Sequence, residues 1–202
     1  MTYVDHNVEI ILCEGKNDEV FLSRILVKNY SIHDYSRKDR IVRRIYDRYH
    51  KDVFFIIREE GKQRLEKNLR TLISKLRSIN RDIEIFVLVD SNNSPTTSYR
   101  SKLYDDIKAY TNNKRRFPRP PSLSFEDKDP FYGTIKVTYI SHKTVIVHIF
   151  VIPHSLEYWI HEKRLNTIGK LKHVNWFTSL CRVLGKLGLI NRNLDENTVL
   201  TG

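Results

Sequence analysis

The sequence predicts an α/β fold of the Rossmann-like kind, with a mainly parallel four-stranded sheet and helices on both faces. Four short apolar runs rich in Val, Ile and Phe do not alternate with polar residues, which is typical of strands covered on both faces. They are Val8–Cys13, Val53–Ile57, Ile83–Val89 and Val145–Ile152. Helical patterns separate the runs, and strands that alternate with helices predict βαβ units with right-handed crossovers.

The segments that follow the apolar runs have helical spacing. Apolar residues within Val20–Leu26 form one stripe, and those within Leu65–Ile79 form a cleaner one. After the third run, Ser94 and Pro95 are typical of a helix N-cap and first-turn residue. They predict a helix that continues to Tyr110.

Two segments depart from this alternation within a domain expected to span residues 1–160. Ser36–Lys51 is interpreted as a basic, helix-like connector. Residues 112–141 are interpreted as a basic insertion. Within it, Thr134–Ile140 alternates apolar and polar residues and is expected to form a hairpin with the fourth run through Ser141–Lys143. Residues 161–202 are expected to form a C-terminal helical extension packed on this domain.

Charge and composition narrow the functional classes. The chain of 202 residues carries a formal net charge of +11, and such an excess attracts polyanions, of which nucleic acid is the expected partner. Two cysteines exclude a disulfide framework or a four-cysteine zinc site, and Cys13 is predicted to be a buried thiol. No apolar run reaches the ~20 residues that cross a bilayer, and Met1–Asn7 lacks a signal-peptide layout. We therefore expect a cytoplasmic protein without membrane contact.

Acidic residues follow three of the four predicted strands. Glu14 comes directly after the first run, Asp90 after the third, and Glu157 shortly after the fourth. In an open parallel sheet, ligands gather beyond the carboxyl ends of the strands. Carboxylates that converge there repel one another unless a cation lies between them, and oxygen ligands suit Mg²⁺ or Mn²⁺. The alternative is structural, since Asn17 or Asp18 can simply cap the first helix.

The order of these pieces resembles a known family. IILCEGKNDEVFLSRIL resembles the opening of a Toprim domain: an apolar strand, Glu-Gly, an Asp four positions after the Glu, and an amphipathic helix. IFVLVDSN is similar to the second Toprim motif, a strand that ends in Asp-x-Asp, and FFIIREEGKQRLEKNL resembles the intervening strand, glycine and helix. IPHSLEYWI is similar to the end of small stand-alone Toprim proteins and of the nuclease half of OLD-type proteins. The resemblance covers most of residues 8–160 and implies a four-stranded Toprim sheet.

The resemblance also implies Mg²⁺-dependent chemistry on phosphodiester bonds. Glu14 matches the glutamate that binds metal or acts as a general acid or base, and Asp90 matches the first metal-binding aspartate. Asn92 falls where the second aspartate usually stands, which removes one negative charge and one strong ligand. Asp18 and Glu157 are candidates to compensate as further ligands of Mg²⁺ or Mn²⁺.

Basic residues near the acids and in two other segments are candidate contacts to nucleic acid. Cations interleaved with tyrosines in the connector suit the phosphates and bases of single strands, although a solvated helix face has the same composition. The proline-containing stretch Lys114–Arg119 contains no acid and is predicted to be a loop. Lys16 and Lys62 either neutralise phosphoryl oxygens or are solvated helix starts. The full set is Lys16, Arg43, Arg44, Lys62, Lys114, Arg115, Arg116 and Arg119.

Two functions follow from these features. The first is a metal-dependent nuclease that acts on DNA or RNA, and the second is a nucleic-acid-binding module that is catalytically weak or inactive, which Asn92 favours. A topoisomerase is disfavoured because the chain lacks room for the domain that supplies a nucleophilic tyrosine. A primase is disfavoured because the zinc-ribbon cysteines are missing. The sequence leaves open whether the chain forms a homodimer.

Overall fold

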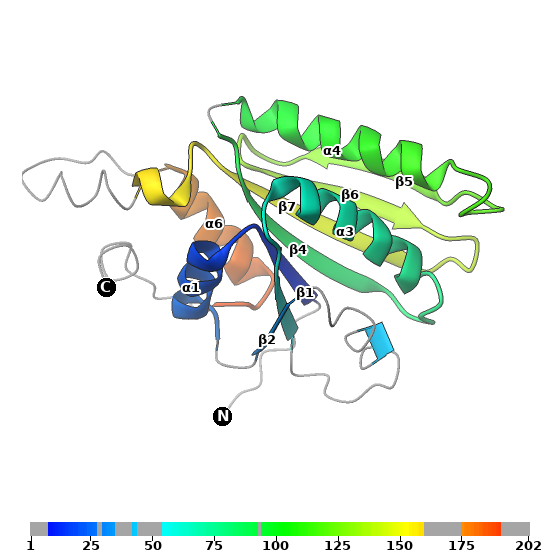
Figure 1. Cartoon of the computed structure of the whole chain (residues 1–202), viewed down its shortest axis with the longest axis horizontal. Coiled ribbons are helices and arrows are strands. Elements are labelled where there is room, and N and C mark those ends of the chain that lie inside the picture. The colour runs from blue at the N-terminus through cyan, green and yellow to red at the C-terminus, as the bar shows by residue number, and fades with distance from the viewer. Residues whose placement is uncertain are drawn as a thin grey trace, which may run out of the picture.

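The computed structural model describes residues 8–27, 30–34, 42–43, 54–92, 94–159 and 175–190. These residues form one sheet of seven strands with helices packed on it (Figure 1). In chain order the elements are β1 (Val8–Cys13), α1 (Lys16–Ile25), β2 (Tyr30–Asp34), β3 (Phe54–Arg58), α3 (Lys62–Leu76), β4 (Ile83–Asp90), α4 (Thr96–Thr111), β5 (Ser122–Asp127), β6 (Tyr132–Thr138), β7 (Thr144–Ile152) and α6 (Asn175–Lys186).

The sheet is mixed, with strand order β2-β3-β1-β4-β7-β6-β5. The first five strands in this order are parallel, whereas β6 runs antiparallel to both β7 and β5. The predicted α/β class is confirmed. The predicted four-stranded sheet is not, because β2, β5 and β6 extend it.

The four apolar runs of the sequence are the four central strands β1, β3, β4 and β7. The packing of alternate residues of β4 shows why polar residues do not interrupt these apolar runs. Ile85 and Val87 enter a core cluster that includes side chains of α3 and α4, while Phe86 and Leu88 enter a second cluster with side chains of α1 and α6. Each central strand thus buries both of its faces, which removes the need for alternating polar residues.

The two strands that the sequence did not predict lie at the edges of the sheet. β2, with sequence YSIHD, contains one large aliphatic residue, Ile32, and forms no apolar run. β5 follows the proline-containing basic stretch and is mostly exposed. Edge strands bury less surface than central ones, so burial selects their residue types less strongly.

The predicted hairpin is present and differs only at its ends. β6 pairs antiparallel with β7, for example Ile135 with Val147, and β5 adds a further antiparallel strand beyond it. The turn contains His142 in the left-handed region, with φ of 62°. Much of the predicted insertion is therefore part of the sheet, and the predicted loop at Lys114–Arg119 lies before β5.

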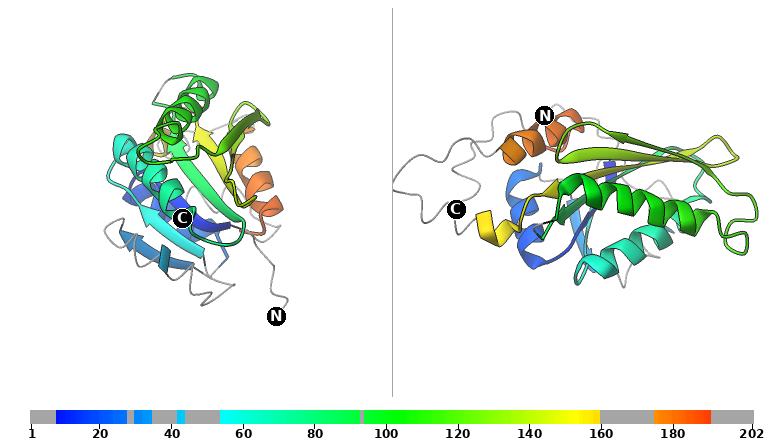
Figure 2. Two further views of the ribbon diagram at one scale, coloured as in Figure 1. Left: turned by 90° about the vertical axis from the view of Figure 1, so that its right-hand side faces the viewer. Right: turned by 90° about the horizontal axis from the view of Figure 1, so that it is seen from above.

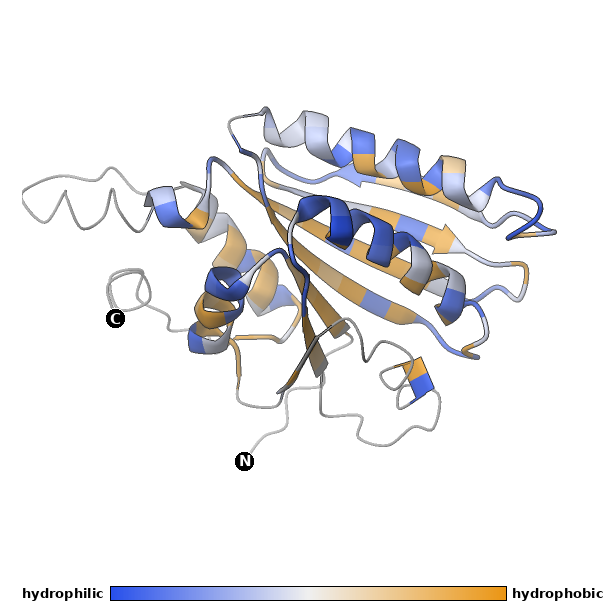
Figure 3. Cartoon of the chain, viewed as in Figure 1, coloured by the Kyte–Doolittle hydropathy of each residue, from blue (hydrophilic) through white to orange (hydrophobic). Residues whose placement is uncertain are grey.

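Helices cover both faces of the sheet, as predicted (Figure 2). The apolar stripe of α3 lies buried against one face, and α6 buries Trp176 and Leu180 against the other. The strands are largely apolar while the outward sides of α3 and α4 are hydrophilic (Figure 3). α4 begins at Thr96 with Pro95 at its cap position, one residue later than predicted, because Ser94 instead donates its N–H to the carbonyl of Ser91.

Two predictions fall largely outside the described residues. Of the basic connector Ser36–Lys51, only residues 42–43 are described, so Arg44 lies outside. Of the C-terminal extension, residues 175–190 are described, and they contain α6. No helix in the described part of the chain is long and apolar enough to cross a membrane.

Candidate functional site

The topology brings Glu14 and Asp90 to one edge of the sheet. β1 and β4 are parallel neighbours, with Cys13 in register with Leu88, so the residues at their carboxyl ends are adjacent. The main-chain N–H of Asp90 donates a hydrogen bond of 3.0 Å to Oε1 of Glu14. The N–H of Ser91 donates to the carbonyl of Ile152 at 2.8 Å, which brings the segment after β7 to the same edge. The expected convergence of these strand ends is observed.

Asp18 lies beside this pair on the first turn of α1. Its side chain is 5% exposed, and its Oδ2 accepts the N–H of Gly15 at 3.0 Å. Asp18 therefore does what the structural alternative expected, since it stabilises the start of the helix. Its charge nevertheless also acts on Asp90, so the structural and electrostatic roles coexist.

Burial and mutual repulsion raise the pKa values of the acids at this edge. Burial, followed by repulsion from Asp18, Glu14 and Glu157, raises the pKa of Asp90 from 3.8 to about 8. Burial is also the main cause that raises the pKa of Asp18 to about 7, with repulsion from Glu14 and Glu157 added to it. The pKa of Glu14 is raised by burial too, although the Asp90 N–H and Lys62 oppose this shift. The site is thus an electrostatically coupled group that gains from any added positive charge.

Glu157 differs from the other acids because it is exposed. Its Oε1 accepts a hydrogen bond of 2.7 Å from Nδ2 of Asn17. This bond is the main cause that lowers the pKa of Glu157. Glu157 is therefore a charged residue at the rim of the group, and Asn17 ties it to the start of α1.

Lys62 is the lysine that enters the site. Its Nζ donates a hydrogen bond of 2.7 Å to the carbonyl oxygen of Asp90 and lies 4.0 Å from the centre of the Tyr99 ring. Burial lowers the pKa of Lys62, while the acids Glu14 and Glu66 oppose the shift. By contrast, the Lys16 side chain is 64% exposed and pairs with Glu19. The alternative of a solvated helix start therefore applies to Lys16 and not to Lys62.

The loop before α3 explains how Lys62 is aimed at the site. Gly61 has a φ of 97°, in the left-handed region that favours glycine, and its N–H donates to the carbonyl of Glu14 at 3.0 Å. The N–H of Glu59 likewise donates to the carbonyl of Cys13 at 2.9 Å. These bonds join the end of β3 to the end of β1, and α3 therefore starts next to the acids.

Sequence reasoning missed two residues of this site. Glu66 is buried on α3, and its charge contributes to the shifted pKa values of Glu14 and Lys62. Glu66 could have been found from the sequence because it follows Lys62 by four residues, a spacing that places both on one helix face. Tyr99 is buried on α4 beneath Lys62, and burial raises its pKa. No sequence pattern indicated Tyr99.

Asn92 is not brought together with the acids by any contact of the described residues. It is exposed, has a φ of 49°, and donates its N–H to the carbonyl of His154 at 3.4 Å. Asparagine enters the left-handed region more readily than most residues. The backbone of this turn therefore gives a reason for asparagine that is independent of metal binding.

The oxygen donors at this edge decide which ions it could hold. Among the described residues, no group of three or more His, Cys, Asp and Glu side chains is placed to hold a metal ion. Oδ1 of Asp90, however, is buried and has no hydrogen-bond partner among those residues. Mg²⁺ keeps several waters and usually takes only one or two carboxylates from a protein. Asp90 and Glu14 supply at most two carboxylates, the number such a partly hydrated ion takes, so they are the residues that could hold one.

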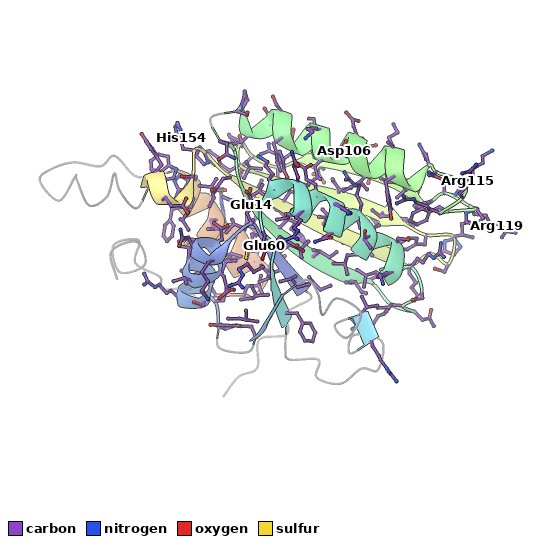
Figure 4. The ribbon with its side chains drawn as sticks, in the orientation of Figure 1. Glu14, Glu60, Asp106, Arg115, Arg119 and His154 are labelled. Carbon is purple, nitrogen blue, oxygen red and sulfur yellow. The ribbon has the colours of Figure 1, made fainter. Side chains whose placement is uncertain are left out.

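The basic loop lies far from these acids. α4 starts just after the site and runs for 16 residues, about 24 Å, before Lys114–Arg119 begins. Figure 4 shows Arg115 and Arg119 at one end of the molecule, with Glu14 nearer its middle and His154 beyond Glu14 on the side away from the arginines. Of the loop cations, Arg116 lies over the Tyr110 ring, 4.5 Å from its centre, while Lys114, Arg115 and Arg119 are exposed. Arg43 is exposed as well, on the short described piece of the connector.

No protein-family model matches the chain, and no similar protein was found among curated sequences or solved structures.

Proposed function

We propose that this protein carries out Mg²⁺- or Mn²⁺-dependent cleavage of nucleic-acid phosphodiester bonds at the Glu14–Asp90 edge of its sheet. One observation carries the proposal: Oδ1 of the half-buried Asp90 is itself buried and has no hydrogen-bond partner among the described residues, and the charges of Asp18 and Glu14 beside it disfavour a negative charge on Asp90. A bound divalent cation would relieve both the repulsion and the missing contact. The order of Toprim-like motifs around the same residues supports this assignment.

The residues have distinct roles in this proposal. Asp90 and Glu14 would hold the cation, with Asp18 behind them. When bound, the cation supplies a more acidic water and polarises the phosphoryl group. Lys62, held against the Asp90 carbonyl, offsets negative charge on the phosphoryl oxygens. Burial raises the pKa of Glu14, which makes its carboxylate a better proton acceptor than an exposed glutamate.

Nucleic acid is the substrate class that the charge favours. The chain carries a net charge of +11 although its candidate site is acidic, so positive charge is concentrated elsewhere on the molecule. The exposed cations of the basic loop would meet phosphates beyond the site.

A cleavage assay tests the proposal. Labelled single- and double-stranded DNA and RNA are incubated with the full chain in Mg²⁺, in Mn²⁺, or in EDTA. We expect metal-dependent cleavage that falls by about two orders of magnitude or more in Asp90→Asn and Glu14→Gln. Asp105→Asn, which changes an exposed acid of α4, is the matched control and should cleave normally. Cleavage that is equal in all three variants would refute the site.

The second candidate is a nucleic-acid-binding module without turnover. It is favoured by the lack of a three-ligand group in the described part of the chain and by the exposed Asn92. It predicts binding of the same substrates with no cleavage in either metal. The two functions therefore separate in one assay, when binding and product formation are followed together.

A further inference from the structure

The segment after β7 carries an aromatic pair beside the acidic site, in which Tyr158 is exposed and His154 is half-buried. The rings of His154 and Tyr158 lie 4.5 Å apart at 34°. Tyr158 is 42% exposed and is the one aromatic residue among the exposed large hydrophobic residues of the described chain. An exposed tyrosine alone is ordinary on a protein surface, so its support and its position decide its meaning.

A continuous set of aromatic contacts supports Tyr158 from below. Its ring packs edge to face with Trp159, with centroids 5.4 Å apart. Trp159 in turn lies 5.9 Å from Trp176, which is buried in the core cluster under α1 and α6. The indole N–H of Trp159 also donates to the carbonyl of Pro153. Packing therefore restricts the Tyr158 ring already, and the ring loses little conformational entropy when a ligand packs on it.

The same segment is attached directly to the residues around the site. The N–H of His154 donates to Oγ of Ser91 at 3.0 Å, one residue after Asp90. Glu157, next to Tyr158, accepts the hydrogen bond from Asn17 of α1. The backbone of His154 is in the left-handed region, with φ of 62°, which marks the turn between β7 and this segment. In Figure 4, His154 and Glu14 both lie away from the basic loop that contains Arg115 and Arg119.

We propose that Tyr158 and His154 form a stacking surface for an unpaired nucleobase whose neighbouring phosphate lies at the Glu14–Asp90 edge. The position of the phosphate rests on the proposed function, whereas the stacking surface does not. An aromatic face attracts a base through the π-face that every base has, and the stacked neighbours in a duplex cover that face. It also needs no contact to phosphate, which suits a surface whose nearest charges are acids. The ligand is therefore a single strand or an unpaired loop.

Fluorescence anisotropy tests this with two labelled oligomers in Ca²⁺: a short oligothymidylate and an abasic oligomer of the same length and charge. The full wild-type chain should bind the oligothymidylate more tightly. Tyr158→Ala should weaken that binding by roughly five- to tenfold and leave the abasic oligomer unchanged. Tyr158→Phe should keep the preference for bases. Ile140→Ala is the control, because Ile140 is a 54% exposed hydrophobic residue in the distant hairpin turn.

A second readout guards against indirect effects of the substitution. An oligomer that contains iodouracil is irradiated with the wild-type chain, and the linked residue is identified by mass spectrometry; we expect Tyr158 or His154. Equivalent RNA oligomers, run in parallel, show which sugar is preferred. If Tyr158→Ala binds both oligomers as the wild type does, the stacking surface is overturned even where cleavage is present. If the base preference depends on Tyr158 but no metal-dependent cleavage occurs, the stacking surface stands and the nuclease proposal fails.

Discussion

At the scale of single residues, Asp90 is the side chain on which the site depends. Glu14 and Asp90 were predicted from the sequence because each follows a buried strand, and parallel neighbours bring their carboxyl ends together. For Lys62 the sequence left two alternatives, a contact to phosphate or a solvated helix start. A lysine at the start of a helix looks the same in sequence whether it is buried or solvated. Tyr99 reaches the site from another element, and no local spacing could predict it.

The raised pKa of Asp90 makes a prediction for stability. Between its ordinary pKa of 3.8 and about 8, the unfolded chain releases this proton while the folded chain keeps it. The free energy of unfolding should therefore fall as pH rises through this window, when no divalent cation is present. In Asp90→Asn the fall should be smaller by roughly 2 kcal/mol, which is well below the full conversion at about 1.4 kcal/mol per pKa unit because the half-buried Asp90 is partly screened by solvent.

Urea denaturation in EDTA across this pH range measures the effect. Asp105→Asn, at an exposed position of α4, should follow the wild type. An identical pH dependence in wild type and Asp90→Asn would show that Asp90 is not a buried acid.

Asn92 gives a second prediction at this scale. Aspartate also tolerates the left-handed region, so Asn92→Asp should fold normally and add a charged ligand beside Asp90. Mn²⁺ affinity should rise by about fivefold to tenfold, and any cleavage in Mg²⁺ should become faster. Isothermal titration calorimetry measures the affinity, with the exposed Asn80→Asp as the control. Unchanged affinity would place Asn92 outside the metal site, in keeping with its exposed side chain.

At the scale of elements, a buried arginine fixes the β5–β6 hairpin to α4. Arg100 is 0% exposed and donates from Nε to Asp127 at 2.8 Å, and from its other nitrogens to the carbonyls of Pro130 and Asp129. From the other face of the sheet, Ser179 of α6 donates to the Asp129 carboxylate at 2.5 Å. The loop between β5 and β6 is thus held by helices on both faces.

Removal of this arginine should be costly. Arg100→Met keeps the apolar stem but leaves two carbonyls and a carboxylate without their donor, so the free energy of unfolding should fall by about 3 kcal/mol. Chemical denaturation measures it. Arg115→Met, at an exposed position of the basic loop, should change stability by less than ~0.5 kcal/mol. A loss in Arg100→Met no larger than in this control would contradict the assigned role.

The same element shows where sequence reasoning was insufficient. Burial on both faces produces a clear pattern in β1, β3, β4 and β7, and those strands were predicted. The edge strands β2 and β5 are less buried, so their sequences show no apolar run. The three acceptors of Arg100 lie between Asp127 and Pro130, in a segment that the sequence presents only as acids and turn residues. Their convergence on one side chain depends on the packing of α4 over the hairpin.

At the scale of the whole molecule, the acidic site and the basic loop lie at opposite ends of the sheet (Figure 4). The length of α4, about 24 Å, corresponds to roughly seven base pairs of duplex. If the proposed function holds, a nucleic acid must therefore exceed this length to contact both ends at once, and the two regions should act on shorter ligands independently.

Substrate length tests this separation. Replacing Lys114, Arg115, Arg116 and Arg119 with Ala should weaken binding of long substrates and reduce the dependence on salt by ~0.7–0.9 log units for each phosphate that the loop no longer neutralises. Binding and cleavage of oligomers shorter than about seven nucleotides should be unchanged. Anisotropy over a salt series with short and long substrates measures this. Equal weakening for both lengths would mean that the loop acts on the site itself.

The central claim is that the Glu14–Asp90 edge holds a divalent cation, and a Mn²⁺ titration followed by electron paramagnetic resonance tests it most directly. Free Mn²⁺ gives a strong signal that disappears on binding, so the titration counts bound ions without any substrate. At a pH above 8, where Asp90 is ionised, the wild-type chain should bind Mn²⁺, while Asp90→Asn should bind it at least about tenfold more weakly and Asp105→Asn should match the wild type. If the wild type binds no Mn²⁺, or if Asp90→Asn binds it equally well, the metal site proposed at this edge is contradicted.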